Sequence, residues 1–233
     1  MIDERPSIDT IKKEIRLVFP YTIPVLTGFL ILGMTYGLLM QTKGYNAFYS
    51  TLMSMLAFCG SMQFVAIALL TTIFDPLQAF LLSFMVNARH IFYGLAMLNK
   101  YKGMGKIKNF LIFTLCDETF SIISSMDIPA SIKPKSFYFY TSLLNYLYWI
   151  SGTLMGGLLG KMIVVDIRGL DFVLTALFVV LFLHQMKRKE NQLYGYLGII
   201  VTLVWLVILG PKNFIIPSMI TILLVLVIKE RAL

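Results

Sequence analysis

The sequence is poor in charged residues, cysteine and histidine. Only 14% of its 233 residues are charged, and it has two cysteines and two histidines. Cys59 and Cys116 lie in apolar segments without metal-ligand spacing, so they indicate neither a disulfide framework nor a metal site. The Gly-x-x-x-x-Gly-Lys-Ser/Thr loop of ATP-binding proteins is absent, as are the Gly-x-Ser-x-Gly and His-Glu-x-x-His motifs of hydrolases. We therefore expect neither an enzyme nor a bound cofactor.

Apolar residues are abundant instead. They make up 58% of the chain, and the mean hydropathy is +0.80, which is more apolar surface than a soluble domain of this length could bury. Most apolar segments approach the ~20 residues of a spanning helix. They cover about 17–40, 47–74, 76–98, 109–126, 137–160, 170–186, 193–209 and 214–228. We predict an all-α polytopic membrane protein with about seven or eight apolar segments, forming a single transmembrane transporter domain over residues 1–233.

The net charge of +8 does not indicate nucleic-acid binding. The basic residues are divided among short segments between apolar runs and form no single stripe. These segments lie within residues 5–16, 100–108, 187–189 and 229–231. The positive-inside rule predicts that all four are cytoplasmic. Residues 1–16, which contain the first of them, are therefore expected to form a cytoplasmic N-terminal segment.

Two apolar segments are predicted to contain broken or re-entrant helices. Three segments separate the N-terminus from the basic loop at 100–108, and an odd number of crossings cannot return the chain to the same side. Segment 47–74 would be ~42 Å long as one helix against a ~30 Å hydrocarbon core, and residues 59–61 (Cys-Gly-Ser) interrupt it. Three segments likewise separate the basic loops at 100–108 and 187–189, so one of them cannot be a simple crossing. We assign this second break to residues 151–153 (Ser-Gly-Thr). Two such units suggest an internal repeat.

The first break is a candidate substrate site. A half-helix that begins at Ser61 would present free backbone N–H groups and a positive dipole end, which suit a carboxylate. Met62 and Gln63 follow within the same turn. Alternatively, Gly60 only allows a close contact between helices.

Asn87-Ala88-Arg89-His90 is a second candidate, because it lies in the middle of segment 76–98. A charged side chain at mid-membrane costs at least ~2.5–3.5 kcal/mol and usually faces a partner, a cavity or a substrate. In a continuous helix Arg89 would point ~200° away from Asn87. Either the helix unwinds there or protein covers both faces.

Asp117 and Glu118 lie near the centre of segment 109–126. On one continuous helix they would form a polar stripe with Thr114, Ser121 and Ser125. We expect Arg89 to pair with Asp117 or Glu118, either as part of the substrate site or as a structural ion pair. His90, Asp117 and Glu118 are candidates for proton coupling, although structural hydrogen bonding is the more common role for a histidine such as His90.

Several of these motifs occur in an order that resembles the AzlC-type branched-chain amino-acid permease family. The motifs are Pro24 with Gly28, Gly33 and Gly37, then residues 58–64 (Phe-Cys-Gly-Ser-Met-Gln-Phe), 87–94 (Asn-Ala-Arg-His-Ile-Phe-Tyr-Gly) and 117–120 (Asp-Glu-Thr-Phe). The resemblance spans most of the chain and is densest between residues 20 and 120. The Asn-x-Arg-His and Asp-Glu-x-Phe motifs match residue for residue, whereas Cys59 and Ser61 stand where the family usually has alanine.

The resemblance implies a secondary transporter of the bacterial cell membrane that exports leucine, isoleucine, valine and analogues such as methionine. It implies proton coupling and a small AzlD-type membrane subunit as partner. On this reading the backbone at Ser61 and Met62, or the Arg89 guanidinium, binds the substrate carboxylate, and Asp117 or Glu118 faces the ammonium group. Gly60 belongs to the substrate site at the break, while Gln63 and Asn87 orient the substrate. The alternative is a channel for small solutes or ions, which broken helices also suit.

Overall fold

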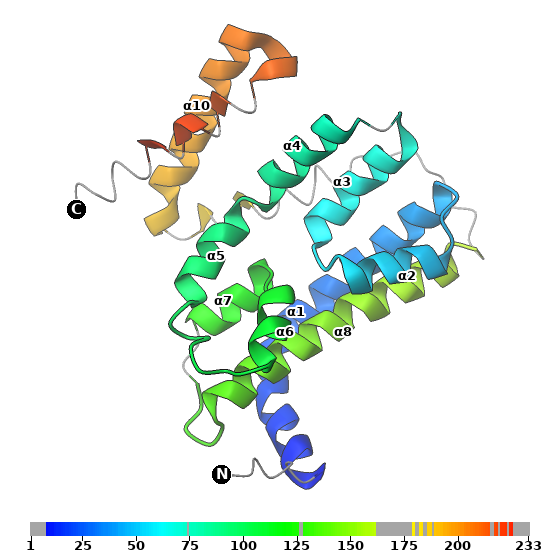
Figure 1. Ribbon diagram of the computed structural model, residues 1–233, viewed down its shortest axis with the longest axis vertical. Coiled ribbons are helices and arrows are strands. Elements are labelled where there is room, and N and C mark those ends of the chain that lie inside the picture. The colour runs from blue at the N-terminus through cyan, green and yellow to red at the C-terminus, as the bar shows by residue number, and fades with distance from the viewer. Residues whose placement is uncertain are drawn as a thin grey trace. The chain divides into compact units, whose positions relative to one another are not determined.

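The computed structural model describes residues 8–73, 75–125, 128–161 and 189–214, together with 179, 182–183, 186–187, 217–218, 220–222 and 224–225. All regular secondary structure in this described part is helical (Figure 1), which confirms the all-α prediction. Its helices are α1 (Ile8–Thr42), α2 (Ala47–Leu56), α3 (Gly60–Thr71), α4 (Pro76–Asn87), α5 (Arg89–Met97), α6 (Ile107–Phe113), α7 (Asp117–Ser125), α8 (Pro134–Leu159) and α10 (Lys189–Asn213). The chain forms two compact units, Met1–Ile167 and Arg168–Leu233.

Two of the described helices are long and apolar enough to cross a membrane. They cover Ile8–Thr42 and Gln192–Pro211. Large apolar side chains on the second are exposed, as Val207 is at 84%, which suits a hydrocarbon environment better than water. The number of apolar segments and the single transporter domain stay predictions. Segment 170–186 lies largely outside the described residues, and segment 214–228 lies partly outside them.

The predicted N-terminal segment 1–16 is partly described. Residues 1–7 lie outside the described part, and residues 8–16 form the first turns of α1. The helix continues through Pro20 and Pro24 to Thr42. The cytoplasmic location of this segment stays a prediction.

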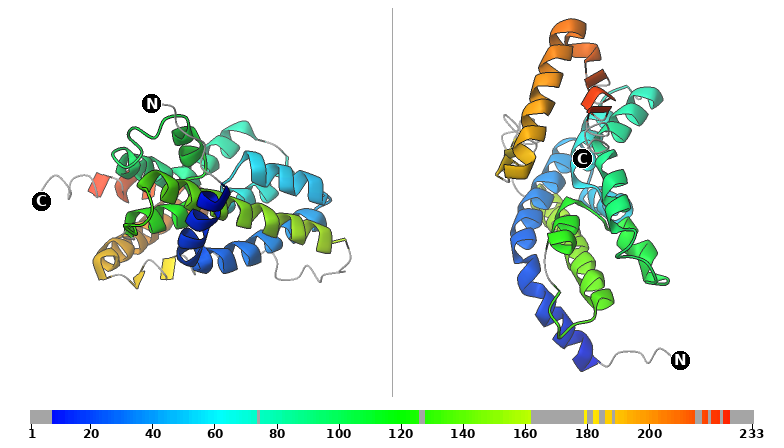
Figure 2. Two further views of the ribbon diagram at one scale, coloured as in Figure 1. Left: turned by 90° about the horizontal axis from the view of Figure 1, so that it is seen from below. Right: turned by 90° about the vertical axis from the view of Figure 1, so that its left-hand side faces the viewer.

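Helices α1 and α8 pack against each other along their length (Figure 2). Glycines make this contact possible, because small residues let two helix backbones approach closely. A Cβ atom added at Gly156 would overlap the carbonyl oxygen of Met34, and one added at Gly37 would overlap the carbonyl oxygen of Thr153. These two helices form the uninterrupted part of the first unit.

The predicted break at residues 151–153 is wrong. Helix α8 runs without interruption from Pro134 to Leu159. A Cβ atom at Gly152 would lie 2.8 Å from the carbonyl oxygen of Phe29 on α1, so this glycine serves the helix contact. The Thr153 hydroxyl donates to the carbonyl of Trp149 at 3.0 Å, which keeps it within the helix. Without this second break, the suggested internal repeat loses its main support.

The other helices of the first unit are short and come in interrupted pairs. Residues 57–59 separate α2 from α3, which confirms the break predicted near residue 60. Helices α4 and α5 meet at Ala88, where the helix is interrupted although the φ and ψ angles of −52° and −34° stay helical. Residues 114–116 separate α6 from α7, so the predicted continuous polar stripe over segment 109–126 is wrong.

Local side chains stabilise these short helices. The Asn46 side chain caps α2 by accepting from the backbone N–H groups of Phe48 and Tyr49. Asp117 and Glu118 occupy the first turn of α7, where the helix dipole favours negative charge. At the other end of α7, the Lys100 ammonium group donates to the carbonyl of Ile123 at 2.6 Å. The sequence therefore positions both acids at a helix start, and they do not lie at mid-helix.

Candidate functional site

Arg89 links two other helices of the first unit. Its Nη1 atom lies 2.7 Å from Oδ2 of Asp117, and its Nη2 atom donates to the Ser61 hydroxyl at 2.6 Å. The Arg89 side chain is 31% exposed and that of Asp117 is 20% exposed. The expected ion pair is thus confirmed with Asp117 as the acid, and the first two candidate sites are one site.

These contacts bring the starts of three helices together. Ser61 is in the first turn of α3, Arg89 opens α5 and Asp117 opens α7. Each helix start carries unsatisfied backbone N–H groups and partial positive charge. This polarity favours Asp117 but not Arg89, so the cation depends on the hydrogen-bonding oxygens of Asp117 and Ser61. A cluster of helix starts is also a common place for an anionic group to bind.

The ion pair leaves two buried atoms without a hydrogen-bond partner among the described residues. They are Nε of Arg89 and Oδ1 of Asp117. One is a donor and the other an acceptor, and buried polar groups of this kind are normally satisfied. The pair therefore offers one contact for an anionic group and one for a cationic group.

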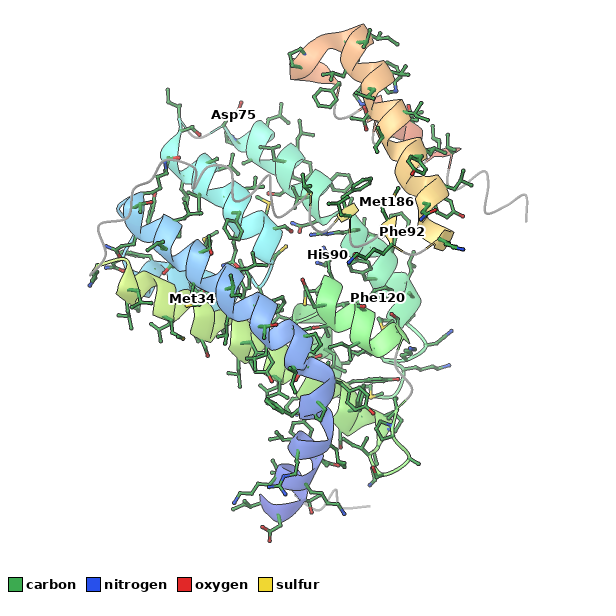
Figure 3. The ribbon with its side chains drawn as sticks, turned by 180° about the vertical axis from the view of Figure 1, so that it is seen from behind. Met34, Asp75, His90, Phe92, Phe120 and Met186 are labelled. Carbon is green, nitrogen blue, oxygen red and sulfur yellow. The ribbon has the colours of Figure 1, made fainter. Side chains whose placement is uncertain are left out.

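Asn87 and His90 lie next to this pair. The Cys59 thiol donates to Oδ1 of Asn87 at 2.9 Å, and Nδ1 of His90 lies 3.3 Å from the carbonyl oxygen of Asn87. The His90 ring meets Tyr93 edge-on with 5.6 Å between centroids, and Tyr93 stacks on Phe120 at 4.4 Å. Figure 3 shows His90 and Phe120 on their helices. His90 thus links the Asn87 backbone to an aromatic group between α5 and α7.

Glu118 and Met62 are half-buried in the first turns of α7 and α3. Glu118 follows Asp117 directly but does not take its place as the partner of Arg89. Gly60 lies against Trp149, since a Cβ atom there would be 2.9 Å from Cη2 of the indole ring. The glycine therefore makes a close contact with α8 in addition to starting the half-helix.

Gln63 belongs to a buried hydrogen-bond network. Its Oε1 atom accepts from Nε1 of Trp149 at 2.6 Å, and its Nε2 atom donates to the Ser54 hydroxyl at 2.9 Å. The Ser54 hydroxyl in turn contacts the Thr153 hydroxyl at 2.9 Å. Gln63 is 1% exposed, so its amide holds α2, α3 and α8 together. The structure does not bring it together with Arg89.

Sequence reasoning missed the residues that hydrogen-bond to Gln63 and Asn87 and hold these two side chains in place. Trp149 and Ser54 fix Gln63, and Cys59 fixes Asn87. For Cys59 the signal was its position directly before Gly60 and Ser61. For Trp149 it was an indole N–H in an apolar segment, which needs an acceptor when buried.

Comparison with known proteins places this site in a family. The family model described as AzlC protein matches residues 24–163, which include every residue of the ion pair and its surroundings. The chain belongs to the AzlC family. It is 44% identical, over 94% of its length and 86% of the relative's, to the branched-chain amino acid transport protein AzlC of Bacillus subtilis.

Other relatives of this AzlC family chain are named only as membrane proteins. One from Haemophilus influenzae is 37% identical over 94% of this chain and 90% of the relative. One from Helicobacter pylori is 36% identical over 95% of this chain and 97% of the relative. No solved structure matches the chain. The names of these relatives and the two membrane-length helices together make the chain a membrane protein.

Proposed function

We propose that this chain is a secondary transporter that exports branched-chain amino acids from the bacterial cytoplasm through the cell membrane. The name of the Bacillus subtilis relative supports the substrate class, and that relative aligns with nearly the whole chain. Export is coupled to proton entry and takes place together with a small AzlD-type membrane subunit. Leucine, isoleucine and valine are the main substrates, and methionine is a further one.

The pair of unpartnered atoms in the ion pair carries this proposal. Nε of Arg89 suits the substrate carboxylate, and Oδ1 of Asp117 suits the substrate ammonium group. An amino acid carries both charges two bonds apart, so one zwitterion can satisfy both atoms. Charge-assisted hydrogen bonds of this kind are about twice as strong as neutral ones.

The surroundings of the pair complete the proposed site. The start of α3, with Ser61 and Met62, adds partial positive charge near the carboxylate. Tyr93 and Phe120 provide apolar surface next to His90. Asn87 and Gln63 act indirectly, since they fix the helix starts on which the binding groups stand.

Proton coupling follows from the chemistry of Asp117. A carboxylate that binds the substrate ammonium group cannot hold a proton at the same oxygen, so proton binding and substrate binding compete. If the two occupants favour opposite orientations of the transporter, their competition produces exchange of substrate for protons. His90 and Glu118 are the other candidates for this proton.

Efflux of radiolabelled leucine from loaded membrane vesicles tests the proposal. We expect Arg89→Gln and Asp117→Asn each to lower efflux at least about tenfold, because each removes one charge that binds the zwitterion. Lys102→Gln is the matched control, since Lys102 is exposed in a loop and its loss should leave efflux unchanged.

The double variant Arg89→Gln/Asp117→Asn separates a binding role from a structural one. Removing both members of an ion pair is often tolerated by a fold, whereas removing one leaves an unpaired charge. A merely structural pair predicts that the double variant regains efflux, and that result would overturn the binding role. The proposal predicts that the double variant folds but shows no leucine efflux.

The same vesicles distinguish a carrier from a channel. Unlabelled leucine outside should accelerate the exchange of labelled leucine through a carrier, and the rate should saturate. Flux that stays linear with the driving force would identify a channel instead. Co-expression of the small subunit should raise leucine efflux. A medium more acidic than the vesicle interior should drive leucine efflux, because protons then enter as leucine leaves.

A further inference from the structure

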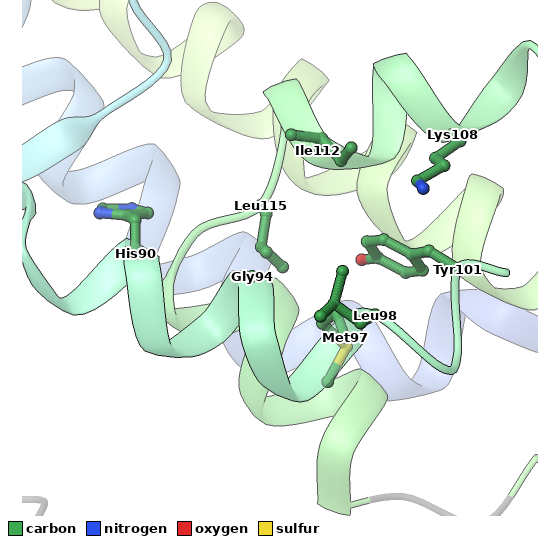
Figure 4. A pocket seen from close by; sticks show the side chains of 8 residues that line it. All are labelled: His90, Gly94, Met97, Leu98, Tyr101, Lys108, Ile112 and Leu115. Atoms are coloured by element: carbon green, nitrogen blue, oxygen red, sulfur yellow. The ribbon is translucent and has the colours of Figure 1, made fainter. Parts of the chain in front are cut away.

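A pocket lies between α5 and α6, and neither Arg89 nor Asp117 lines it. Its volume is about 270 Å³, just below the ~300 Å³ at which typical small-molecule pockets begin. Figure 4 shows His90 at one end and Lys108 at the other. The wall between them is apolar and consists of Met97, Leu98, Ile112 and Leu115. We call this space the α5–α6 pocket.

A buried tyrosine hydroxyl points to a polar occupant of this pocket. Tyr101 is 2% exposed, and its hydroxyl has no hydrogen-bond partner in the described part of the chain. Figure 4 shows the hydroxyl directed toward the interior of the pocket. The Tyr101 ring packs against Tyr138 with 6.0 Å between centroids, which fixes its direction. Because buried hydroxyls are normally satisfied, an occupant with a polar atom fits here better than a hydrocarbon tail.

Lys108 and Gly94 give the pocket its charge and its width. The ammonium group of Lys108 pairs with no carboxylate among the described residues, so it can bind an anionic group. A Cβ atom added at Gly94 would meet nothing within 4 Å, so the glycine keeps space open beside α5. These features suit a small molecule with an apolar part and an anionic group such as a carboxylate.

We propose that the α5–α6 pocket is an access subsite for the transported amino acid, an inference that rests on the proposed function. Lys108 binds the carboxylate, the apolar wall takes the side chain, and the Tyr101 hydroxyl accepts from the ammonium group. His90 lines this pocket and directly follows Arg89 at the start of α5. The amino acid thus binds first in the α5–α6 pocket and then moves to the central site at Arg89 and Asp117.

Protection of an introduced cysteine tests this subsite without requiring transport. Ile112→Cys is made in a full-length chain whose native thiols are removed by Cys59→Ser and Cys116→Ala, and labelling by a maleimide is timed in open membranes. We expect leucine to slow the labelling at least about threefold. Ile91→Cys is the matched control, because Ile91 and Ile112 are equally exposed, at 55% and 54%, but Ile91 lies outside the pocket. Its labelling should not respond.

Two further variants separate the subsite from the central site. Protection at Ile112→Cys should persist with Arg89→Gln, because the α5–α6 pocket does not contain Arg89. Its loss there would mean that the label reports only on the central site, which overturns the inference. Failure of the proposed function would appear differently, as the absence of leucine efflux from wild-type vesicles while protection persists.

Filling the pocket should abolish protection. Gly94→Leu occupies the open space, whereas Gly198→Leu on α10, which also has nothing within 4 Å of its added Cβ atom, should have no effect. Lys108→Gln should raise the leucine concentration for half-protection about tenfold, equivalent to one charge-assisted contact. Protection by dodecanoate but not by leucine would identify a groove for a lipid tail and overturn the inference, as would protection that survives Gly94→Leu.

Discussion

The chain contains two similar triplets of small residues with opposite structures. Cys59-Gly60-Ser61 lies where one helix ends and α3 begins, whereas Ser151-Gly152-Thr153 lies inside the continuous helix α8. Both have a central glycine between small polar residues in an apolar segment. The local sequence is therefore not what decides whether the helix breaks.

The neighbour of each glycine explains the difference. Backbone atoms of Phe29 and Leu30 on α1 lie about 3 Å from the position of a Cβ atom at Gly152, whereas Gly60 faces the end of the Trp149 side chain. A regular helix is needed to bring two backbones together along their length. Next to Gly60 the helix is instead interrupted, and the first turn of α3 places the Ser61 hydroxyl where it accepts from Arg89. Small residues thus serve packing in one region and a polar site in the other.

The largest expected effect comes from Gly156→Ala in the packed region. The added methyl group overlaps the Met34 carbonyl, and rigid backbone cannot move aside as a side chain can. We expect a loss of stability of ~3 kcal/mol, at the upper end for overpacking, measured as thermal unfolding in detergent. Gly28→Ala on α1 is the control, since its Cβ atom would meet nothing within 4 Å. Equal stability of the two variants would contradict the tight contact between α1 and α8.

A direct comparison of Gly152→Ala with Gly60→Ala sharpens the contrast between the triplets. We expect ~2 kcal/mol of destabilisation at Gly152, where backbone is the obstacle, and ~1 kcal/mol at Gly60, where the indole ring can shift. Thermal unfolding measures both. A larger loss at Gly60 would show that the break is the more tightly packed of the two places.

The smallest effect concerns the connection between the two regions. Trp149→Phe removes the donor to Oε1 of Gln63 and leaves that oxygen buried, which we expect to cost ~1 kcal/mol, the lower end for a buried acceptor without a partner. The other tryptophan serves as control, since Nε1 of Trp205 donates to the partly buried Thr221 hydroxyl and Trp205→Phe should cost less. If both variants unfold at the same temperature, Gln63 does not depend on Trp149.

Much of the site was predictable from single residues, because charge in an apolar segment is costly and needs a partner. Arg89 and the acids at 117 and 118 stand out for that reason alone, and so does the break near Gly60. The choice of Asp117 over Glu118 was not predictable from the sequence. It depends on α7 starting at residue 117, which places the first acid at the helix start facing Arg89.

The errors have a common physical cause. Segments 109–126 and 137–160 were interpreted by composition, which does not reveal where helix hydrogen bonding stops. Thr114 ends α6 although nothing in its apolar neighbourhood signals an end, and Gly152 continues α8 although glycine often marks an end. At Gly152 the close approach of α1 overrides the local preference.

The length of α1 has a consequence for how the protein sits in a bilayer. Its 35 residues extend up to ~52 Å, which exceeds the ~30 Å hydrocarbon core by ~20 Å. Tilt or an extension into the headgroup layer has to take up this surplus, and the N-terminal turns carry Lys12, Lys13 and Arg16. Anionic headgroups attract such residues by ~1 kcal/mol each. We therefore expect bilayer thickness and lipid charge to act on the same helix that packs against α8 through its glycines.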